Sequence, residues 1–361
     1  MEMDEPEDVI EQLRDIAEQG SEAACLELAR HYEEGDGVDE LILKAAYWYA
    51  QALRIRSSAR AHVGIALAFE SEGVWDHDAA VQRYMVAAGM NEPSAYVALG
   101  YAYAAGMGVP EDARKAAYWF RRAAMQDIPA AEFGLGLIYE KGEGLPRDDA
   151  RAVYWVRRAA EHGYADAQTH LGKMYSCGNC GLRRNKKRAF EWHMLAAQQC
   201  EPEAESFVGD CYAVGRGVQM SVEKAVMWYR RAAGHGDAWG QVGLALCYQH
   251  GMGVEENVAT AMRWYRKAAA QDNEVANYEL GMYYLNGCGR KPAPKKAYRH
   301  MSAAARAGYP SAQWELSRML RSGIGVAPNA AEAFEWLCKA ADAGCNEAVR
   351  ELRAQKKGGQ A

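Results

Sequence analysis

The chain lacks the sequence features of a membrane, secreted or nucleic-acid-coating protein. No stretch approaches the ~18 uninterrupted apolar residues that a membrane helix needs. The acidic opening, Met1 to Asp8, contains no apolar run and is no secretory signal. A formal net charge of −6 over 361 residues is mild and argues against a protein that coats nucleic acid. We therefore expect a soluble, cytoplasmic protein with no membrane insertion and no nucleic-acid partner.

Catalytic motifs are missing as well. The sequence contains no Gly-x-Ser-x-Gly, no P-loop, no His-Glu-x-x-His and no strand pattern that could support a nucleotide site. Gly-x-Gly recurs, but it lies between two helical patterns and a bulky residue usually follows it, so it is a poor phosphate loop. We expect no enzymatic activity, no cofactor and no small-molecule substrate.

The chain has nine cysteines, an odd number, scattered singly apart from Cys177 and Cys180. This pattern points to a reducing compartment. Together with His193 and Cys200, the Cys177-x-x-Cys180 pair could supply four metal ligands or act as a redox pair. However, His193 occupies a column of packing residues, and the βαβ setting of thioredoxin-like chemistry is missing. The sequence favours an irregular structural turn and no metal, with the metal and redox interpretations as alternatives.

What the sequence does have is an internal repeat. A Gly-x-Gly turn recurs, with 36 residues between successive turns from Gly215 onward, and a tryptophan follows most turns 13 residues after their first glycine. A Leu-Gly-x-x-Tyr column precedes the turn and an Ala-Ala pair ends the segment after it. The turns are at Gly35/Gly37, Gly106/Gly108, Gly142/Gly144, Gly215/Gly217, Gly251/Gly253, Gly287/Gly289 and Gly323/Gly325.

Each column has a physical role. Alanine and glycine on facing helices allow close approach, the large residues fill the remaining space, and a turn glycine permits positive φ at a helix end. We count nine units, of which the second keeps only Gly73 in its turn, the fifth has a longer turn and the eighth places His300 in the tryptophan column. One hairpin cannot bury its apolar face alone, so the sequence predicts an all-α solenoid of stacked helix-turn-helix units.

The pattern Leu-Gly-x-x-Tyr-x-x-Gly-x-Gly-Val, followed by Lys-Ala-x-x-Trp-Tyr-x-x-Ala-Ala, resembles the Sel1-like repeat, a relative of the tetratricopeptide repeat. The match covers roughly Glu22 to Gly344. The resemblance implies a right-handed superhelix of αα-hairpins that holds other proteins. We expect an N-terminal capping helix within residues 1–21, one continuous solenoid domain over 22–344, and a capping helix to about Gln355 with a disordered tail over 345–361.

The resemblance also predicts a binding surface, because in tetratricopeptide-type stacks the first helix of each hairpin lines a concave groove. The position two residues after the leucine column, here called the variable column, reads Arg30, Leu67, Tyr101, Leu137, Lys173, Asp210, Leu246, Met282 and Arg318. The position two before the leucine, here called the inner column, includes Phe133, Tyr278 and Trp314. A third column has Glu33, Glu70 and Glu140 early and Arg321 at the end, which predicts a groove with graded charge.

From these columns we predict that Tyr101, Leu137, Leu246, Met282, Phe133, Tyr278, Trp314 and Arg318 contact a partner. The alternative is that these side chains cover one another between tightly curled repeats. The predicted function is a non-enzymatic scaffold or adaptor for a protein or peptide. Two alternatives are a dedicated inhibitor or immunity protein that neutralises an enzyme toxin, and a metal- or redox-responsive module at Cys177-x-x-Cys180.

Two basic clusters stand apart from the repeat columns. One runs from Arg183 to Arg188, and the other comprises Arg290-Lys291 and Lys295-Lys296 in the equivalent turn three units later. No aromatic residues interleave with the first run. The sequence favours solvated loops, with an anionic partner or a nuclear-import signal as the alternative.

Overall fold

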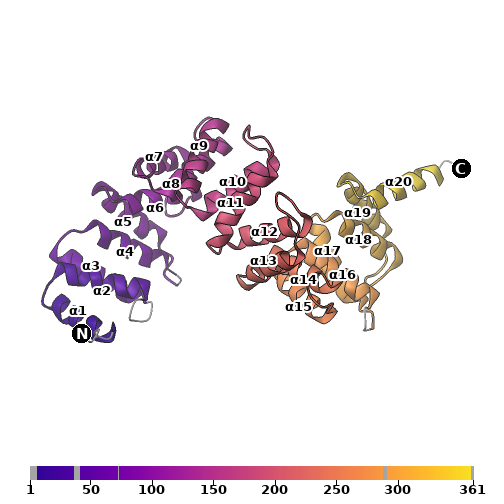
Figure 1. Ribbon diagram of the computed structural model, residues 1–361, viewed down its shortest axis with the longest axis horizontal. Helices are drawn as coiled ribbons and strands as arrows, with labels where there is room; N and C mark the ends of the chain where they lie inside the picture. Colours follow the sequence, from indigo (N-terminus) through magenta and orange to yellow (C-terminus); the bar gives the residue numbers. More distant parts are fainter. Residues whose placement is uncertain (1–5, 36–40, 72, 288–290, 359–361) are drawn as a thin grey trace. The chain divides into compact units, whose positions relative to one another are not determined.

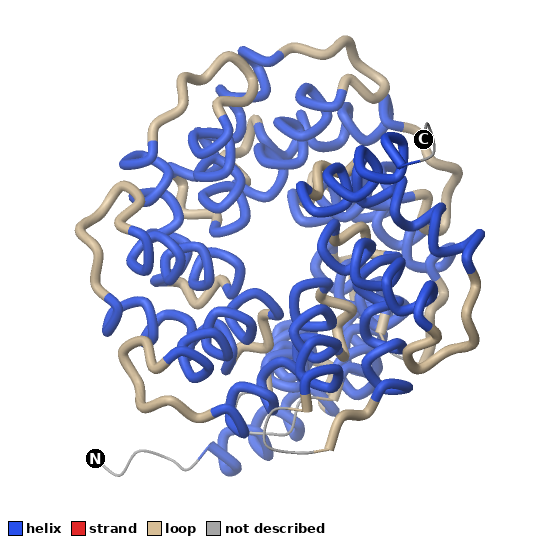
Figure 2. The backbone as a smooth tube through the Cα atoms, turned by 90° about the vertical axis from the view of Figure 1, so that its right-hand side faces the viewer, coloured by secondary structure: helices blue, strands red, loops and turns tan. Residues whose placement is uncertain are grey.

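The computed structural model describes residues 6–35, 41–71, 73–287 and 291–358. Within these ranges the chain forms twenty helices and no strand (Figure 2), which confirms the all-α prediction. The helices are α1 (Pro6–Glu18), α2 (Glu22–Glu34), α3 (Ile42–Ile55), α4 (Ala59–Glu70), α5 (His77–Gly89), α6 (Pro93–Ala105), α7 (Ala113–Ala124), α8 (Pro129–Lys141), α9 (Asp149–Glu161), α10 (Ala165–Cys177), α11 (Lys186–Gln198), α12 (Pro202–Val214), α13 (Val222–Gly234), α14 (Ala238–His250), α15 (Val258–Ala269), α16 (Glu274–Asn286), α17 (Pro294–Arg306), α18 (Pro310–Ser322), α19 (Ala330–Asp342) and α20 (Asn346–Gly358).

The chain divides into two compact units, Met1–Arg183 and Arg184–Ala361, which are described separately. In the first unit α2 packs on α3, α4 on α5, α6 on α7 and α8 on α9; in the second, α12 packs on α13, α14 on α15, α16 on α17 and α18 on α19. Each pair also contacts the next pair in its own unit, so that neighbours in sequence are neighbours in space (Figure 1). The single continuous domain over residues 22–344 stays a prediction.

The two glycines of each turn have different roles. Gly106 ends α6 in the left-handed region at φ 68°, and its N–H group bonds to the carbonyl oxygen of Ala102. Gly108 also has positive φ, and a Cβ atom there would lie 2.2 Å from the carbonyl oxygen of His77, at the start of α5. The second glycine therefore packs directly against the preceding repeat's second helix, as Gly217 does against Lys186 at 2.2 Å.

The Leu-Gly column sets the spacing between the two helices of a repeat. Leu99 is fully buried, and a Cβ atom on Gly100 would lie 2.5 Å from the ring of Phe120 on α7. Gly209 stands in the same relation to Tyr229 on α13, at 2.6 Å. In these two repeats an aromatic ring of the second helix thus occupies the space that a side chain on the glycine would need, whereas Ala245 and Ser317 stand in the same column of the seventh and ninth repeats.

Most second helices begin with a side-chain cap. Seven N-cap residues accept a backbone N–H bond through their side chains, namely Asp76, Asp112, Asp148, Asn185, Ser221, Asn257 and Asn329. Leu41 before α3 and Ala293 before α17 make no such bond. A cap of this kind stabilises a helix by ~1 kcal/mol, and these two helices do without it.

Capping helices flank the repeats. α1 covers Pro6–Glu18, inside the residues where the sequence predicts an N-terminal cap. α20 continues to Gly358, past the Gln355 at which the sequence analysis ended it, because Gln355, Lys356 and Lys357 are all good helix formers. Residues 1–5 and 359–361, the latter part of the predicted disordered tail, lie outside the described residues.

Candidate functional site

All nine side chains of the variable column reach solvent. Tyr101 is 38% exposed, Lys173, Asp210 and Arg318 are also exposed, and the other five are half-buried. The inner column is more enclosed, since Val63, Thr169, Ser206 and Val242 are buried, whereas Phe133, Tyr278 and Trp314 are half-buried. Leu137, Leu246 and Met282 thus combine partial packing with an accessible apolar surface.

Four rings from three successive first-helix segments form an aromatic cluster in the first unit: Tyr101, Phe133, Tyr164 and His170. The Phe133 ring lies 5.7 Å from that of Tyr164 and 5.6 Å from that of His170. The hydroxyl groups of Tyr101 and Tyr164 interact electrostatically, and burial raises the pKa of both. His170 in turn pairs with Glu140 at 2.6 Å. Tyr101 and Phe133 are predicted contact residues, whereas Tyr164 and His170 were not predicted from the sequence.

The second unit repeats part of this arrangement. The Tyr278 ring packs in a tilted arrangement, at 5.0 Å, against that of Tyr309, which is the N-cap residue of α18, as Tyr164 is of α10. Both N-cap tyrosines follow a glycine and stand at the same distance in sequence from the inner-column ring that they touch. That recurring Gly-Tyr pair was the sequence signal for these residues.

The capping helix α20 occupies part of the predicted surface of the last repeat. The Trp314 indole N–H group donates to Glu351 at 3.0 Å, and the same carboxylate pairs with Arg321. Arg318 lies over the Trp314 ring at 5.0 Å and bonds to Glu315 at 2.9 Å. Trp314 is therefore held by the chain itself, whereas the Arg318 side chain is 53% exposed.

The charges of the third column also have partners within the chain. Glu33 accepts hydrogen bonds from the Tyr49 hydroxyl group and from Arg60, the latter at 2.8 Å. Glu70 accepts from the Tyr84 hydroxyl group at 2.8 Å. Glu140, the third acidic residue of this column, pairs with His170. Because these carboxylates are already engaged, the graded charge predicted for the groove offers a partner less than the formal charges imply.

Asp210 is the one acid of the variable column. Its carboxylate accepts a hydrogen bond from the Tyr229 hydroxyl group at 2.7 Å. Protein atoms surround it although it still reaches solvent, and this desolvation raises its pKa while the hydrogen bond from Tyr229 opposes the rise. Such an enclosed but accessible carboxylate is suited to bind a cationic group.

The cysteine motif has the properties of a structural turn. Cys177 and Cys180 are free thiols, and Cys180 has positive φ. Burial, aided by the carboxylates of Glu140 and Asp149, raises the pKa of Cys180 to about 11, so it carries little thiolate at neutral pH. In the second unit His193 is buried and stacks at 3.8 Å on Phe207, whereas Cys200 is exposed.

Cys200, Glu205 and His235 place potential metal-ligand atoms within 4.8 Å of one another. However, the fully buried Glu205 carboxylate pairs with Arg231 at 2.9 Å and with His235 at 2.8 Å. The first unit has the same arrangement without a cysteine, since Glu132 pairs with Arg158 and His162 at 2.8 and 2.9 Å. The cluster is thus explained as a recurring ion-pair network rather than a metal centre.

No helix in the described part of the chain is long and apolar enough to cross a membrane. The site residues described above lie on stacked helix pairs that end in left-handed glycines and share a core with the next pair. This arrangement defines the class of α/α solenoid repeat proteins.

The chain belongs to the Sel1 repeat family. The model of the Sel1 repeat matches eight segments, residues 22–54, 93–128, 129–164, 165–199, 202–237, 240–273, 275–309 and 310–345. The pair α4–α5, the degenerate second unit, falls outside the matches. Sel1 repeat proteins generally mediate protein–protein interactions and are typically non-catalytic.

Solved structures agree with this assignment. A Sel1 repeat protein from Oxalobacter formigenes is similar, with 29% identity over 98% of this chain and 94% of that chain and a TM-score of 0.61. A protective antigen of uropathogenic Escherichia coli that displays an SLR fold has 26% identity over 96% and 90% of the two chains, with a TM-score of 0.53. An immunity protein from Pseudomonas aeruginosa has 19% identity over 60% and 83%, but its TM-score of 0.42 supports no argument. A comparison with curated proteins found no match.

Proposed function

We propose that the chain is a non-enzymatic scaffold that binds a protein or peptide on the surface of its first helices. The observation that carries this proposal is the variable column, where nine equivalent positions all reach solvent and yet differ in chemistry from repeat to repeat. A column that only filled the core would be uniformly apolar and buried. A column that is accessible and variable is typical of a surface adapted to a partner.

Contacts between repeats support the choice of the first helices. α6 contacts α8, and α12 contacts α14, so first helices of neighbouring repeats touch each other directly in both units. No pair of neighbouring second helices is in comparable contact among the described residues. The elements on the inner side of a curved stack lie closest together, which supports a concave surface made by first helices.

Preorganisation supports Tyr101 as an anchor. Its ring packs edge-on against Phe120 at 5.0 Å, and its hydroxyl group interacts electrostatically with that of Tyr164. A side chain that is already fixed loses little conformational entropy on binding, and half-exposed tyrosines are frequent anchors at interfaces. Leu137, Leu246 and Met282 add apolar area that a partner would remove from water.

The test is a tagged pull-down from native cells under reducing conditions, with quantitative mass spectrometry. Two double variants divide the surface by unit: Tyr101→Ala with Leu137→Ala, and Leu246→Ala with Met282→Ala. Each should reduce capture of the wild-type partner at least tenfold if both units contact it. Circular dichroism checks that each variant keeps its helix content.

The matched control removes exposed apolar side chains of similar size from the second helices, Tyr118→Ala, Tyr154→Ala and Met227→Ala, which are 55%, 56% and 47% exposed. This control should retain the partner. Equal capture by all variants would contradict the proposed surface. Loss of the partner from the second-helix control alone would assign binding to the opposite face. Capture of a single enzyme at one-to-one stoichiometry would indicate an inhibitor of that enzyme rather than a scaffold.

A further inference from the structure

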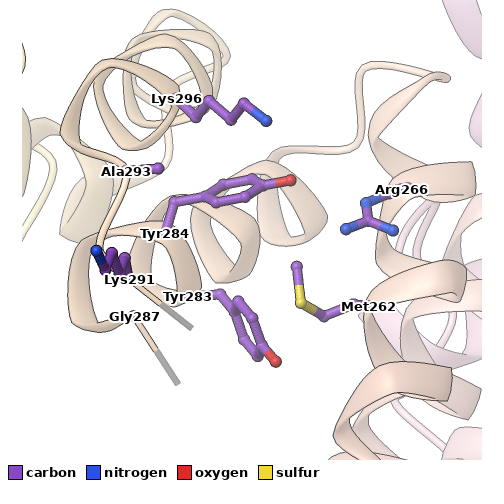
Figure 3. Close-up of a pocket in the computed structure, with 8 residues that line it drawn as sticks. All are labelled: Met262, Arg266, Tyr283, Tyr284, Gly287, Lys291, Ala293 and Lys296. Atoms are coloured by element: carbon purple, nitrogen blue, oxygen red, sulfur yellow. The ribbon is translucent and has the colours of Figure 1, made fainter. Parts of the chain in front are cut away.

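A cavity of about 150 Å³ lies between α15, α16 and α17 in the second unit. Its wall includes Arg266, Lys291 and Lys296, together with Tyr284 and Met262. Figure 3 shows the Tyr284 hydroxyl group and the Lys296 ammonium group on one side and the Arg266 guanidinium group facing them across the cavity. Tyr283 and Met262 form an apolar wall on a third side (Figure 3).

The cavity carries an excess of positive charge. None of its lining residues is acidic, and its three cations form no ion pair with any other residue in the described ranges. A neighbouring group responds to this charge. The pKa of His300, which stacks on Tyr284 at 5.6 Å, is lowered by burial and by the positive charges of Arg299, Arg266 and Lys296.

The fourth repeat shows one way in which the fold fills this position. Tyr139, the equivalent of Tyr284, accepts hydrogen bonds from Arg121 of the preceding repeat at 3.3 Å and from Arg151 at 3.4 Å. Arg151 is in turn paired at 3.2 Å with Asp148, the N-cap residue of α9. A carboxylate supplied by the chain therefore balances the cations around this tyrosine.

The eighth repeat keeps the cations and lacks the carboxylate. Arg266 and Lys296 stand at the same sequence distances from Tyr284 as Arg121 and Arg151 do from Tyr139. The Lys296 Nζ atom lies 5.6 Å from the Tyr284 ring centre, as expected for the repeat's usual pairing of cation and ring. At the position of Asp148, however, the chain has Ala293, which has no side-chain acceptor. Lys291 adds a third cation to the same wall.

We propose that this cavity binds a phosphate dianion, either free or as a phosphomonoester, in the place that Asp112 and Asp148 occupy in the third and fourth repeats. Two or three cations around one cavity match a charge of −2 better than that of a single carboxylate. The Arg266 guanidinium group provides a planar pair of donors for phosphate oxygens, and Lys296 and Lys291 provide point charges. The wall of Met262 and Tyr283 would contact the carbon side of an ester. This site is separate from the variable column and does not depend on it.

The experiment titrates the full chain with inorganic phosphate by isothermal titration calorimetry in a low-salt, phosphate-free buffer. Saturable one-to-one binding is expected, and it should weaken at least tenfold in Arg266→Gln and in Lys296→Gln. Arg121→Gln, the same substitution at the equivalent position of the fourth repeat, is the matched control and should bind phosphate as wild type does.

Ala293→Asp provides a test that does not depend on losing a structural residue. It introduces the carboxylate that Asp112 and Asp148 supply in the third and fourth repeats, so it should abolish phosphate binding and raise the Tm, whereas the neutral cap Ala293→Ser should retain binding. A parallel titration with phosphoserine separates the sources, because tighter binding than that of inorganic phosphate would indicate an ester and equal binding would indicate the free ion. Absence of saturable binding, or unchanged binding in both Arg266→Gln and Ala293→Asp, would overturn the proposal.

Discussion

The hydroxyl groups of Tyr101 and Tyr164 interact electrostatically, although Tyr101 belongs to α6 and Tyr164 precedes α10. The two residues come from first-helix segments with α8 between them in sequence. Phe133 of α8 packs against Tyr164 as well. The cluster thus contains residues of three successive repeats, and this connects the surface proposed for binding to the stability of the stack.

The tyrosine pair should show energetic coupling. In a double-mutant cycle of Tyr101→Phe and Tyr164→Phe, we expect a coupling free energy of about 0.5–1.5 kcal/mol, because the two hydroxyl groups interact within one cluster. Urea unfolding followed by circular dichroism provides the measurement. Tyr118→Phe, on the exposed face of α7, should show no coupling to Tyr164, and additivity in the first cycle would show that the two hydroxyl groups do not stabilise each other.

The glycine of the Leu-Gly column should be required in those repeats where an aromatic ring faces it. Gly209→Ala drives a Cβ atom towards the Tyr229 ring and should lower the free energy of unfolding by about 1–3 kcal/mol. Gly234→Ala in the same hairpin is the control, because a Cβ atom there meets nothing within 4 Å. It should be neutral or stabilise by up to about 1 kcal/mol. Equal effects of the two substitutions would show that the helices can separate without cost.

Replacing the buried glutamate of the first unit should separate charge from packing. Gln168 and Gln313, at positions equivalent to Glu132, donate to the carbonyl oxygens of Ala160 and Ala305 at 3.0 and 3.2 Å. Glu132→Gln should therefore be neutral or stabilising by about 1 kcal/mol at pH 7. Glu132→Ala removes all hydrogen bonds and should cost about 2 kcal/mol. Thermal unfolding of both variants checks this, and a loss in Glu132→Gln as large as in Glu132→Ala would show that the ion pair itself is required.

The same glutamate should give the stability a definite pH dependence. Burial raises the pKa of Glu132, although His162 and Arg158 oppose the rise. The folded state therefore holds this proton more tightly than the unfolded state, whose glutamate pKa is about 4.3. Stability of the wild type relative to Glu132→Gln should fall as the pH rises from about 4 through the folded pKa. Urea unfolding of both proteins at several pH values measures the difference, and a rise with pH would have the wrong sign.

Cys180 should be a slow thiol. With its pKa raised to about 11, its thiolate fraction at neutral pH is about a hundredfold below that of an ordinary cysteine. Iodoacetamide labelling followed by peptide mass spectrometry should modify the exposed Cys177 well before Cys180. Rapid labelling of both, or a Cys177–Cys180 disulfide formed by mild oxidant, would favour the redox hypothesis.

The repeat architecture could be predicted because its signals are local. The turn glycine, the Leu-Gly pair and the Ala-Ala pair each make contacts within one hairpin or with the adjacent one. The positions of the helices can therefore be predicted from the sequence of a single repeat. The degenerate second unit is still a helix pair, α4–α5, because alanines and Tyr84 keep its core although Arg83 replaces the tryptophan.

The details of the site were less accessible from the sequence because they depend on contacts between repeats. The inner column predicted Phe133 as a contact residue, but no column predicted Tyr164, whose ring packs against Phe133 from the next repeat. Formal charge predicted an acidic early groove, whereas Glu33 and Glu70 are engaged by tyrosine hydroxyl groups. The significance of Ala293 appears only when the surroundings of Tyr284 and Tyr139 are compared in space.

The glycine contacts of the turns have an evolutionary consequence. Gly108 packs on the start of α5 at His77, and Gly144 packs on the start of α7 at Ala113. Both the two glycines and the two helix starts are 36 residues apart. A recombination event in the coding DNA that removes one such period leaves Gly144 facing His77, with every remaining turn still seated on a helix end. Evolution can therefore shorten or lengthen this protein by whole repeats while the contact between each turn glycine and the preceding helix start is kept.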